Sequence, residues 1–285
     1  MTNTEKNKVL PSTLYLVATP IGNLLDISER AKKVLSEVDF IAAEDTRNSL
    51  KLISAYGIKK ELVSYFEHNK KASGERIIAR LLGGESCALI TDAGMPAISD
   101  PGEDIVRLCA EAGITVNIVP GACAAVSALA LSALPTGKFT FEGFLPAAKG
   151  ERMRELKKLE YEYRTMIFYE APHKLLKTLE DMISVFGGER KISLSRELTK
   201  LNEETLRTTL ENAFSLFSEK EPRGEYVLVV EGNSCEKETE LSSLTVPEHI
   251  NHYINSGLSK KDAIKAVAKD RGVPKSEIYK YTIED

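Results

Sequence analysis

The chain has 285 residues, of which 42% are apolar and 28% are charged, and it carries a formal net charge of −4. This composition is typical of a globular protein with one large core or two ordinary domains, and the acidic balance argues against a general polyanion binder. The N-terminal residues lack the order of a secretory signal, and no stretch has about 18 uninterrupted apolar residues, so we expect a cytoplasmic protein without a membrane span.

Short β-rich runs alternate with helical patterns in the first half of the chain. The runs are LYLVA at 14–18, VDFIAA at 38–43, CALIT at 87–91 and ITVNIV at 114–119. This alternation predicts a mostly parallel sheet with helices on its faces. The small residues of the stretch 118–134 predict a helix that packs on a sheet rather than one that crosses a membrane.

Two helices of the first half are marked by capping signals. Asp26, with Glu29 three residues later, resembles a capping box in front of a helical pattern that runs to residue 38. Asp100 as N-cap and Pro101 at the first helical position predict the start of another helix, and Gly113 predicts its end.

The segment 134–155 is rich in proline, glycine and charge, and we place the boundary between two α/β halves there. The runs TMIFYE, KISLSRE and YVLVVEG that follow predict further strands, with helices around 175–186 and 210–217. We therefore expect three parts: an N-terminal α/β domain over 12–136, a second α/β domain over 139–232, and a small helical C-terminal unit of helix-turn-helix type over 246–285.

Several familiar motifs are missing from the sequence. No GxGxxG follows a predicted strand, and there is no phosphate-binding GxxxxGK[ST] loop and no GxSxG nucleophile elbow. His249 and His252 have HxxH spacing but no further obvious ligands, so we predict packing or surface residues and no metal site. The cysteines show no metal-ligand spacing and are predicted to be small core residues in a reducing compartment: Cys87, Cys109, Cys123 and Cys235.

Three neutral loops follow predicted strands of the first half: TPIGN at 19–23, TDAGMPAISDPG at 91–102 and PGACAA at 120–125. In open α/β sheets, ligands bind at this carboxyl edge. Glycine and alanine allow close backbone approach, and the shortage of Lys and Arg suits a ligand that is not a phosphate ester. Each loop taken alone also fits a simple tight turn, but three of them on one edge favour a binding site.

The segments LYLVATPIGNLLDISERA, AAEDTR, ITDAGMPAISDPG, VPGACAA, FEGFLP, FYEAPH and RGEYVLVVEG resemble, in this order, the tetrapyrrole methylase superfamily. Within it, AEDTR with TDAGMP, FEGFLP and FYEAPH is similar to a family of small-subunit ribosomal RNA methyltransferases. The resemblance implies S-adenosylmethionine as methyl donor in a cleft between two α/β domains. It also implies methylation of a cytidine 2′-hydroxyl in the decoding region of 16S rRNA, either free or in the assembled small subunit, by a homodimer.

Carried over position by position, the resemblance implies a donor pocket formed by Pro20, Ala93, Gly94, Met95, Ile98, Cys123, Ala124, Tyr169, Glu170, Leu198 and Gly224. Many superfamily members have an acid near the position of Met95, whereas this chain reads AGM there. Asp92 comes earlier, and the departure favours backbone contacts to the donor.

The charged stretch at residues 44–47 is the expected acceptor side of the site. A ribose hydroxyl is a poor nucleophile until its proton is removed or strongly hydrogen-bonded, and a nearby carboxylate could serve as base or orienter. We predict Asp45 as that base, with Glu44 as second choice and His68 as a weaker alternative, and Arg47 as a contact to an RNA phosphate. In the alternative interpretation, Glu44 or Asp45 caps the next helix and Arg47 pairs with one of them.

Two other functions compete with RNA methylation. The same scaffold could methylate a tetrapyrrole or another small molecule, or the chain could be a ligand-sensing regulator whose tail binds nucleic acid. The charged loop and the helical tail favour RNA over the small molecule, and the weak charge of the tail disfavours the regulator. Basic residues that could follow RNA are dispersed and include Arg80, Arg152, Arg154, Lys260, Lys261 and Lys265.

Overall fold

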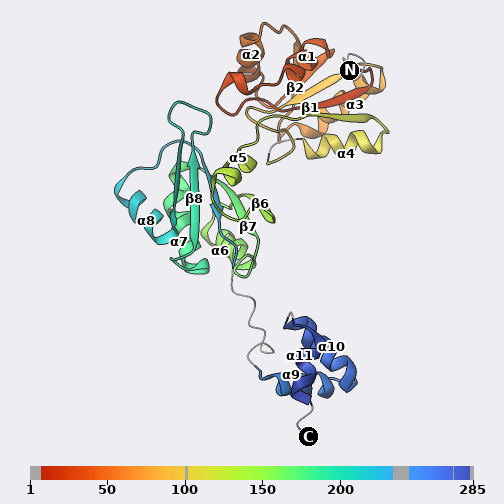
Figure 1. Cartoon of the computed structure of the whole chain (residues 1–285). Coiled ribbons are helices and arrows are strands. Elements are labelled where there is room, and N and C mark those ends of the chain that lie inside the picture. Colours follow the sequence, from red (N-terminus) through yellow and green to blue (C-terminus); the bar gives the residue numbers. More distant parts are fainter. Residues whose placement is uncertain (1–7, 100–101, 234–243, 272, 283–285) are drawn as a thin grey trace. The chain divides into compact units, whose positions relative to one another are not determined.

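The computed structural model describes residues 8–99, 102–233, 244–271 and 273–282 (Figure 1). The chain divides after Gly232 into two compact units, and both β-sheets belong to the first unit. The expected α/β class, with two sheets and C-terminal helices, is confirmed. The domain limits expected at 12–136, 139–232 and 246–285 remain predictions.

The first sheet is entirely parallel, with strand order β3-β2-β4-β1-β5. Its strands are β1 (Thr13–Val17), β2 (Phe40–Ala43), β3 (Glu61–Ser64), β4 (Cys87–Ile90) and β5 (Thr115–Val119). The four predicted runs are all strands. The unpredicted one, β3, lies at an edge of the sheet and is only half-buried, so its sequence lacks a continuous apolar run.

Alternate residues of these strands bury against helices on opposite faces (Figure 1). On β1, Tyr15 and Val17 face one helical layer, and Leu14 and Leu16 face the other. The helices are α1 (Glu29–Glu37) and α2 (Thr46–Ala55) in the first layer, and α3 (Lys70–Leu82) and α4 (Glu103–Glu111) in the second. The result is a three-layer sandwich whose loops at the carboxyl ends of the strands remain open for binding.

The predicted capping of α1 was wrong. Ser28 is the N-cap, because its side chain accepts a hydrogen bond from the backbone N–H of Ala31 at 3.1 Å. Asp26 instead lies in the 3-10 helix η2 (Leu24–Asp26). Asp100 and Pro101, the predicted start of α4, lie outside the described residues; α4 ends before Gly113, whose φ of +68° suits a glycine.

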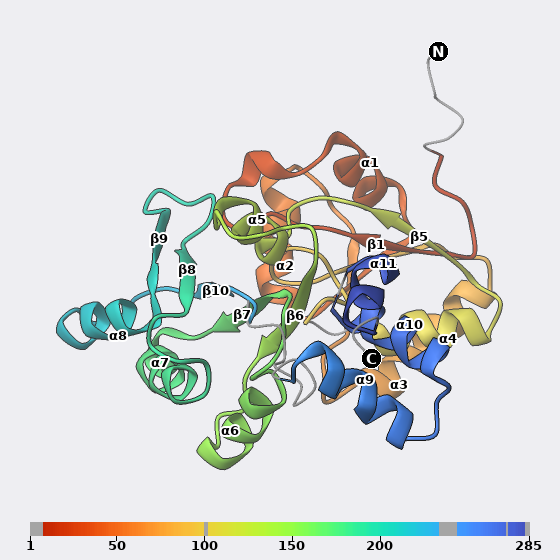
Figure 2. The same cartoon turned by 60° about the horizontal axis from the view of Figure 1, so that its bottom comes forward.

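The second sheet is mixed, with order β6-β7-β10-β8-β9, and only the β6–β7 pair is parallel. Its strands are β6 (Phe139–Phe144), β7 (Thr165–Glu170), β8 (Lys191–Arg196), β9 (Glu204–Thr209) and β10 (Tyr226–Val230). The buried strands β7, β8 and β10 were predicted. The sequence did not reveal β6 and β9, which are the partly exposed edges; Figure 2 shows β9 joined to β8 as a hairpin.

One face of the second sheet carries a large hydrophobic core, formed with α6 (Lys149–Lys158), α7 (Pro172–Phe186) and α8 (Leu210–Glu219). The other face is covered by α5 (Ala124–Leu131), where Ala125 and Ala128 pack with Ile167 and Val229. Small side chains let this helix lie close to the sheet, as its sequence predicted. Among the described residues, no helix is long and apolar enough to cross a membrane.

The C-terminal unit contains α9 (Val246–Asn255), α10 (Lys260–Asp270), α11 (Lys275–Tyr279) and the 3-10 helix η3 (Lys280–Thr282). Its small core is formed by residues such as Ile250, Ile264, Val267 and Ile278. Thr245 and Glu248 form a capping box at the start of α9.

Candidate functional site

A cavity of about 250 Å³ lies where the carboxyl ends of the first sheet's strands meet the second sheet. The loops after β4 and β5 form one wall, and the ends of β7 and β8 with the start of β10 form the other. The two walls therefore come from segments that are far apart in the sequence. We call this the interdomain cavity, after the two α/β domains that the sequence predicts.

The loop after β4 is held against the loop after β1 by two backbone hydrogen bonds. Thr19 donates its N–H to the carbonyl of Gly94 at 2.9 Å, and Gly94 donates back to the carbonyl of Thr19 at 3.1 Å. Gly94 has a φ of +85°, and the non-glycine residues Ala97 and Ser99 also have positive φ, at 66° and 65°. Backbone strain of this kind is kept where the surroundings enforce it, often at ligand sites.

The interdomain cavity brings together most of the predicted donor residues: Ala93, Gly94, Met95, Ile98, Cys123, Ala124, Tyr169, Glu170 and Leu198. Pro20 does not line it, although its neighbour Ile21 does. Gly224 lines a different cavity on the other face of the second sheet, while Glu225 lines this one. These residue roles remain predictions, because only the positions of the side chains are given by the fold.

Glu170 is a fixed carboxylate in the wall of the cavity. It is only 2% exposed, and its two oxygens accept hydrogen bonds from the N–H of Ala171 at 2.8 Å and from Thr178 Oγ1 at 2.6 Å. Ala171 is the N-cap of α7, where the helix dipole favours a negative charge, and Thr178 lies further along the same helix. These two hydrogen bonds fix the position of the carboxyl group in the wall of the cavity.

Sequence reasoning missed several lining residues that supply charge and apolar surface: Ile21, Asp92, Phe144, Glu197 and Tyr226. Asp92 and Phe144 fall within the quoted segments TDAGM and FEGFLP, so the motifs contained the signal although the residues were not chosen. With Glu170 and Glu225, the cavity has more carboxylates than cations, since Lys200 is the one lysine that lines it among the described residues. Such a site favours a cationic ligand.

Asp45 has the structure of a helix cap. It is the N-cap of α2, where Oδ1 accepts a hydrogen bond from the N–H of Arg47 at 2.8 Å. The Arg47 guanidinium also pairs with it, at 3.0 Å from Nη2 to Oδ2. Hydrogen bonds from Arg47 lower the pKa of Asp45 to about 2, so this carboxylate is a weak proton acceptor. The geometry matches the alternative interpretation of this loop, in which Asp45 caps α2 and pairs with Arg47.

Glu44 lies one residue earlier, at the end of β2, in a different environment. Its pKa is raised by burial, and further by the charges of Asp92 and Asp45. Asp92 lines the interdomain cavity and accepts a hydrogen bond from Asn48 Nδ2 at 3.0 Å. The acidic loop is thus connected to the cavity through Asp92, and Glu44 is a better proton acceptor than Asp45. His68 does not line this cavity.

Two of the basic residues that could follow RNA are engaged within the protein. Arg152 is buried and pairs with Asp181 at 2.7 Å between α6 and α7. Arg80 pairs with Glu61 at 2.9 Å and with Glu85 at 2.6 Å. Arg152 is therefore a structural residue rather than a contact for RNA. Among the described residues, no cluster of three or more His, Cys, Asp or Glu side chains is arranged to hold a metal ion.

Comparison with known proteins adds independent information. The profile of the family Tetrapyrrole (Corrin/Porphyrin) Methylases matches residues 13–213. The chain is 51% identical over 270 residues to "Ribosomal RNA small subunit methyltransferase I" of Halalkalibacterium halodurans, covering 94% of this chain and 93% of the relative. It is 48% identical over 270 residues to the protein of the same name from Bacillus subtilis, covering 93% and 92% of the two chains.

Solved structures with a similar fold are more distant in sequence. Diphthine synthase aligns with a TM-score of 0.60 at 15% identity, covering 77% of this chain and 90% of its own. Uroporphyrin-III C-methyltransferase from Thermus thermophilus, complexed with S-adenosylhomocysteine, aligns with a TM-score of 0.54 at 16% identity, covering 77% and 97%. At these identities the likeness concerns the fold of the two-sheet unit.

Proposed function

Because the chain belongs to the tetrapyrrole (corrin/porphyrin) methylase family, we propose that it is an S-adenosylmethionine-dependent methyltransferase acting on the 2′-hydroxyl of a cytidine in small-subunit ribosomal RNA. The observation that supports this substrate is the relationship to proteins named ribosomal RNA small subunit methyltransferase I, at 51% and 48% identity over more than nine-tenths of each chain. We propose that the methyl acceptor lies in the decoding region of 16S rRNA, as the family resemblance of the motifs implies.

The residues of the interdomain cavity fit this methyl donor. S-adenosylmethionine supplies an electrophilic methyl group on a positively charged sulfonium. The carboxylates of Glu170 and Asp92 suit its positive charges, and Ile21, Met95 and Leu198 offer apolar surface to its adenosine part. The strained loop around Gly94 places backbone groups beside the same space.

We assign the proton-accepting role to Glu44 rather than to Asp45. In methyl transfer the ribose oxygen forms a bond to the methyl carbon while the carbon–sulfur bond of the sulfonium breaks and a neutral thioether leaves, and the hydroxyl proton must go to a base. Glu44 has the raised pKa and lies near Asp92 at the cavity, whereas Asp45 is held by Arg47. Arg47, whose side chain is 87% exposed, remains available to an RNA phosphate through its outer edge, so Arg47→Ala should weaken RNA binding and reduce its salt dependence.

The setting of the reaction completes the proposal. The substrate is rRNA, as free RNA or in the assembled small subunit, and the enzyme works in the cytoplasm as a homodimer, the arrangement implied by the superfamily. These features do not alter the chemistry assigned to Glu44 and Arg47.

The direct test is to incubate the purified chain with radiolabelled methyl donor and, in parallel, 16S rRNA, isolated small subunits that lack the modification, and a porphyrinoid. We expect label in rRNA, at the 2′-oxygen of one cytidine, from at least one RNA preparation. Label in the porphyrinoid and in neither RNA sample would refute the RNA assignment, whereas failure to bind the donor would favour the regulator.

A further inference from the structure

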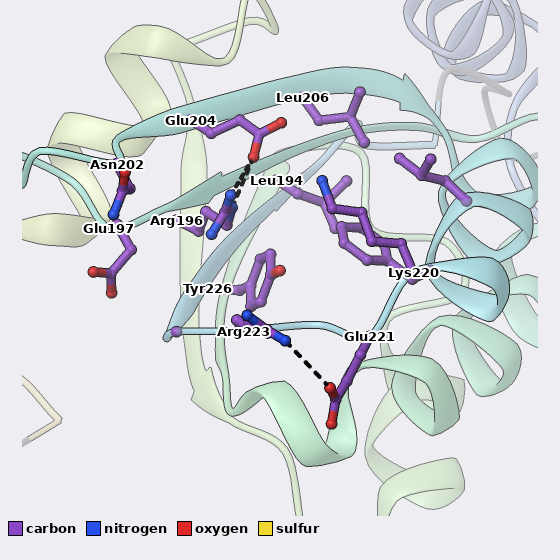
Figure 3. Close-up of a pocket in the computed structure, with 13 residues that line it drawn as sticks. Leu194, Arg196, Glu197, Asn202, Glu204, Leu206, Lys220, Glu221, Arg223 and Tyr226 are labelled. Atoms are coloured by element: carbon purple, nitrogen blue, oxygen red, sulfur yellow. Dashed lines mark hydrogen bonds and ion pairs between the residues drawn. The ribbon is translucent and has the colours of Figure 1, made fainter.

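A second cavity, of about 640 Å³, lies on the α8 side of the second sheet, and the proposed reaction does not use it (Figure 3). Its floor is apolar: Leu194 from β8, Leu206 from β9, and Phe217 from α8, which packs edge-to-face with Tyr226 at 5.6 Å between ring centroids. The volume is within the range of about 300–1,000 Å³ that is typical of small-molecule sites. We call it the α8 cavity.

The rim of the α8 cavity carries three cations and three carboxylates, and one of the cations lies outside the ion pairs. Arg196 pairs with Glu204 at 2.7 Å, and Arg223 lies 3.9 Å from Glu221, as the dashed lines in Figure 3 show. The third carboxylate, Glu197, pairs with Lys200 at 3.0 Å. Among the described residues, Lys220 has no ion-pair partner.

Arg223 is also available to a ligand. Its side chain and that of Glu221 are each about four-fifths exposed, and an ion pair of 3.9 Å in such a position holds its partners weakly. In Figure 3 the Tyr226 side chain, which is only 3% exposed, lies between Arg196 and Arg223. An anionic group with an attached flat ring would therefore find cations at the rim and apolar surface beneath.

The α8 cavity and the interdomain cavity share a wall. Glu197 and Tyr226 line both, and the adjacent residues Gly224 and Glu225 line one each. Glu197 has a φ of +51°, and a Cβ on Gly224 would meet its Oε1 at 2.7 Å, so the wall is tightly packed and conformationally strained. Two ligands in these cavities would lie on opposite faces of the second sheet, at the same end of β8 and β10.

We infer that the α8 cavity is a nucleotide subsite, which holds one nucleotide next to the methylated cytidine of the RNA substrate. Its phosphate contacts Lys220 and Arg223, and its base lies over the apolar floor near Tyr226. Single-stranded RNA is commonly bound by cations on the backbone together with apolar or aromatic contacts to splayed bases. The inference rests on the proposed function, because the subsite would hold the nucleotide next to the cytidine that the proposed reaction methylates.

The test compares two double variants of the full chain that change the net charge equally. Lys220→Glu with Arg223→Glu alters the rim, and Lys157→Glu with Lys177→Glu alters two exposed lysines on α6 and α7 of the same domain. We expect the rim variant to raise the KM for RNA about 10-fold or more. Its donor Kd and its kcat at saturating RNA should stay within about twofold of wild type. The control variant should change none of these three constants.

A crosslinking measurement gives a direct readout in the wild-type protein. RNA substrate with 4-thiouridine at each nucleotide flanking the target cytidine is irradiated on the enzyme, and the crosslinked peptides are identified. We expect crosslinks within residues 204–226 from one flanking position. Crosslinks only elsewhere, or a rim variant that behaves like its control while wild type methylates rRNA, would overturn the subsite alone. A weaker donor Kd in the rim variant would also overturn it, and absence of rRNA methylation by wild type would overturn the proposed function and the subsite together.

Discussion

Asn48 donates a hydrogen bond from Nδ2 to Asp92 Oδ2 at 3.0 Å, and this contact joins the first turn of α2 to the loop that lines the interdomain cavity. Asn48→Ala removes the donor and leaves Asp92 without it. We expect kcat/KM for methyl transfer to fall about 10-fold, equivalent to about 1.4 kcal/mol of transition-state stabilisation. Steady-state kinetics with Asn212→Ala, an exposed position on α8, as control would check this; an unchanged kcat/KM would show that the contact is dispensable.

The neighbouring carboxylates Glu44 and Asp45 are distinguished by paired substitutions. Glu44→Gln removes the proposed base, so kcat should fall about 100-fold while the donor Kd stays nearly unchanged. Asp45→Asn keeps an N-cap of equal quality and loses only the exposed ion pair with Arg47, so kcat should fall less than about threefold. Single-turnover rates would reveal the opposite order if Asp45 is the base.

The pH dependence of turnover follows from the raised pKa of Glu44. The ionised form accepts the proton, so kcat should decline as the pH falls through a pKa above 4.5, and this acidic limb should be absent from the residual activity of Glu44→Gln. The effect on stability has the opposite sign. Because folding raises this carboxyl pKa, ionised Glu44 lowers stability as the pH rises through that window, and Glu44→Gln should therefore melt at a higher temperature near neutral pH. A lower melting temperature would contradict the environment described for Glu44.

Alanine substitutions at two glycines with positive φ distinguish the effect of backbone strain from an effect on ligand binding. Gly94 has a φ of +85°, and a Cβ there would lie 3.3 Å from Ile21 Cγ2 at the interdomain cavity. Gly57 has a φ of +72° and no atom within 4 Å of such a Cβ. Both alanine variants should lose about 1 kcal/mol of stability through strain, but only Gly94→Ala should raise the donor Kd, by about 10-fold, in calorimetry. Equal donor affinities would exclude this loop from the donor site.

The buried pair of Arg152 and Asp181 predicts a large effect on stability. Arg152 donates from Nε to Asp181 at 2.7 Å and from Nη1 to the carbonyls of Pro146 and Ala147 at 3.2 and 2.9 Å. Among the described residues, Arg152→Ala leaves the buried Asp181 carboxylate with one ion-pair partner, the exposed Lys149 at 3.8 Å, so the free energy of unfolding should fall by about 3–5 kcal/mol. Denaturant unfolding of Arg154→Ala, an exposed position on the same helix, should show a change within about 0.5 kcal/mol. Equal losses in both variants would contradict the buried pair.

Most of the fold could be predicted from the sequence, because buried strands and amphipathic helices leave a local pattern. The runs at β1, β2, β4, β7, β8 and β10 were visible because both faces of these strands are largely buried. The run at β5 was visible although this strand is a partly exposed edge of the first sheet, because it is rich in β-branched residues. The edge strands β3, β6 and β9 were missed, since half-exposed strands carry polar residues that resemble loops. The capping of α1 was misplaced because Asp26 and Ser28 both suit an N-cap, and hydrogen-bond geometry selected Ser28.

The sequence by itself determined which loops would gather at the carboxyl edge of the first sheet, because the direction of parallel strands follows from their order along the chain. It also contained the motifs of the family. Only the tertiary structure decided the environments of individual side chains, such as the different surroundings of Glu44 and Asp45. These two acids are adjacent in sequence, yet one is partly buried near Asp92 and the other is neutralised by Arg47. A carboxylate's pKa depends on burial and on charges brought near by folding, and no local pattern of residues specifies either.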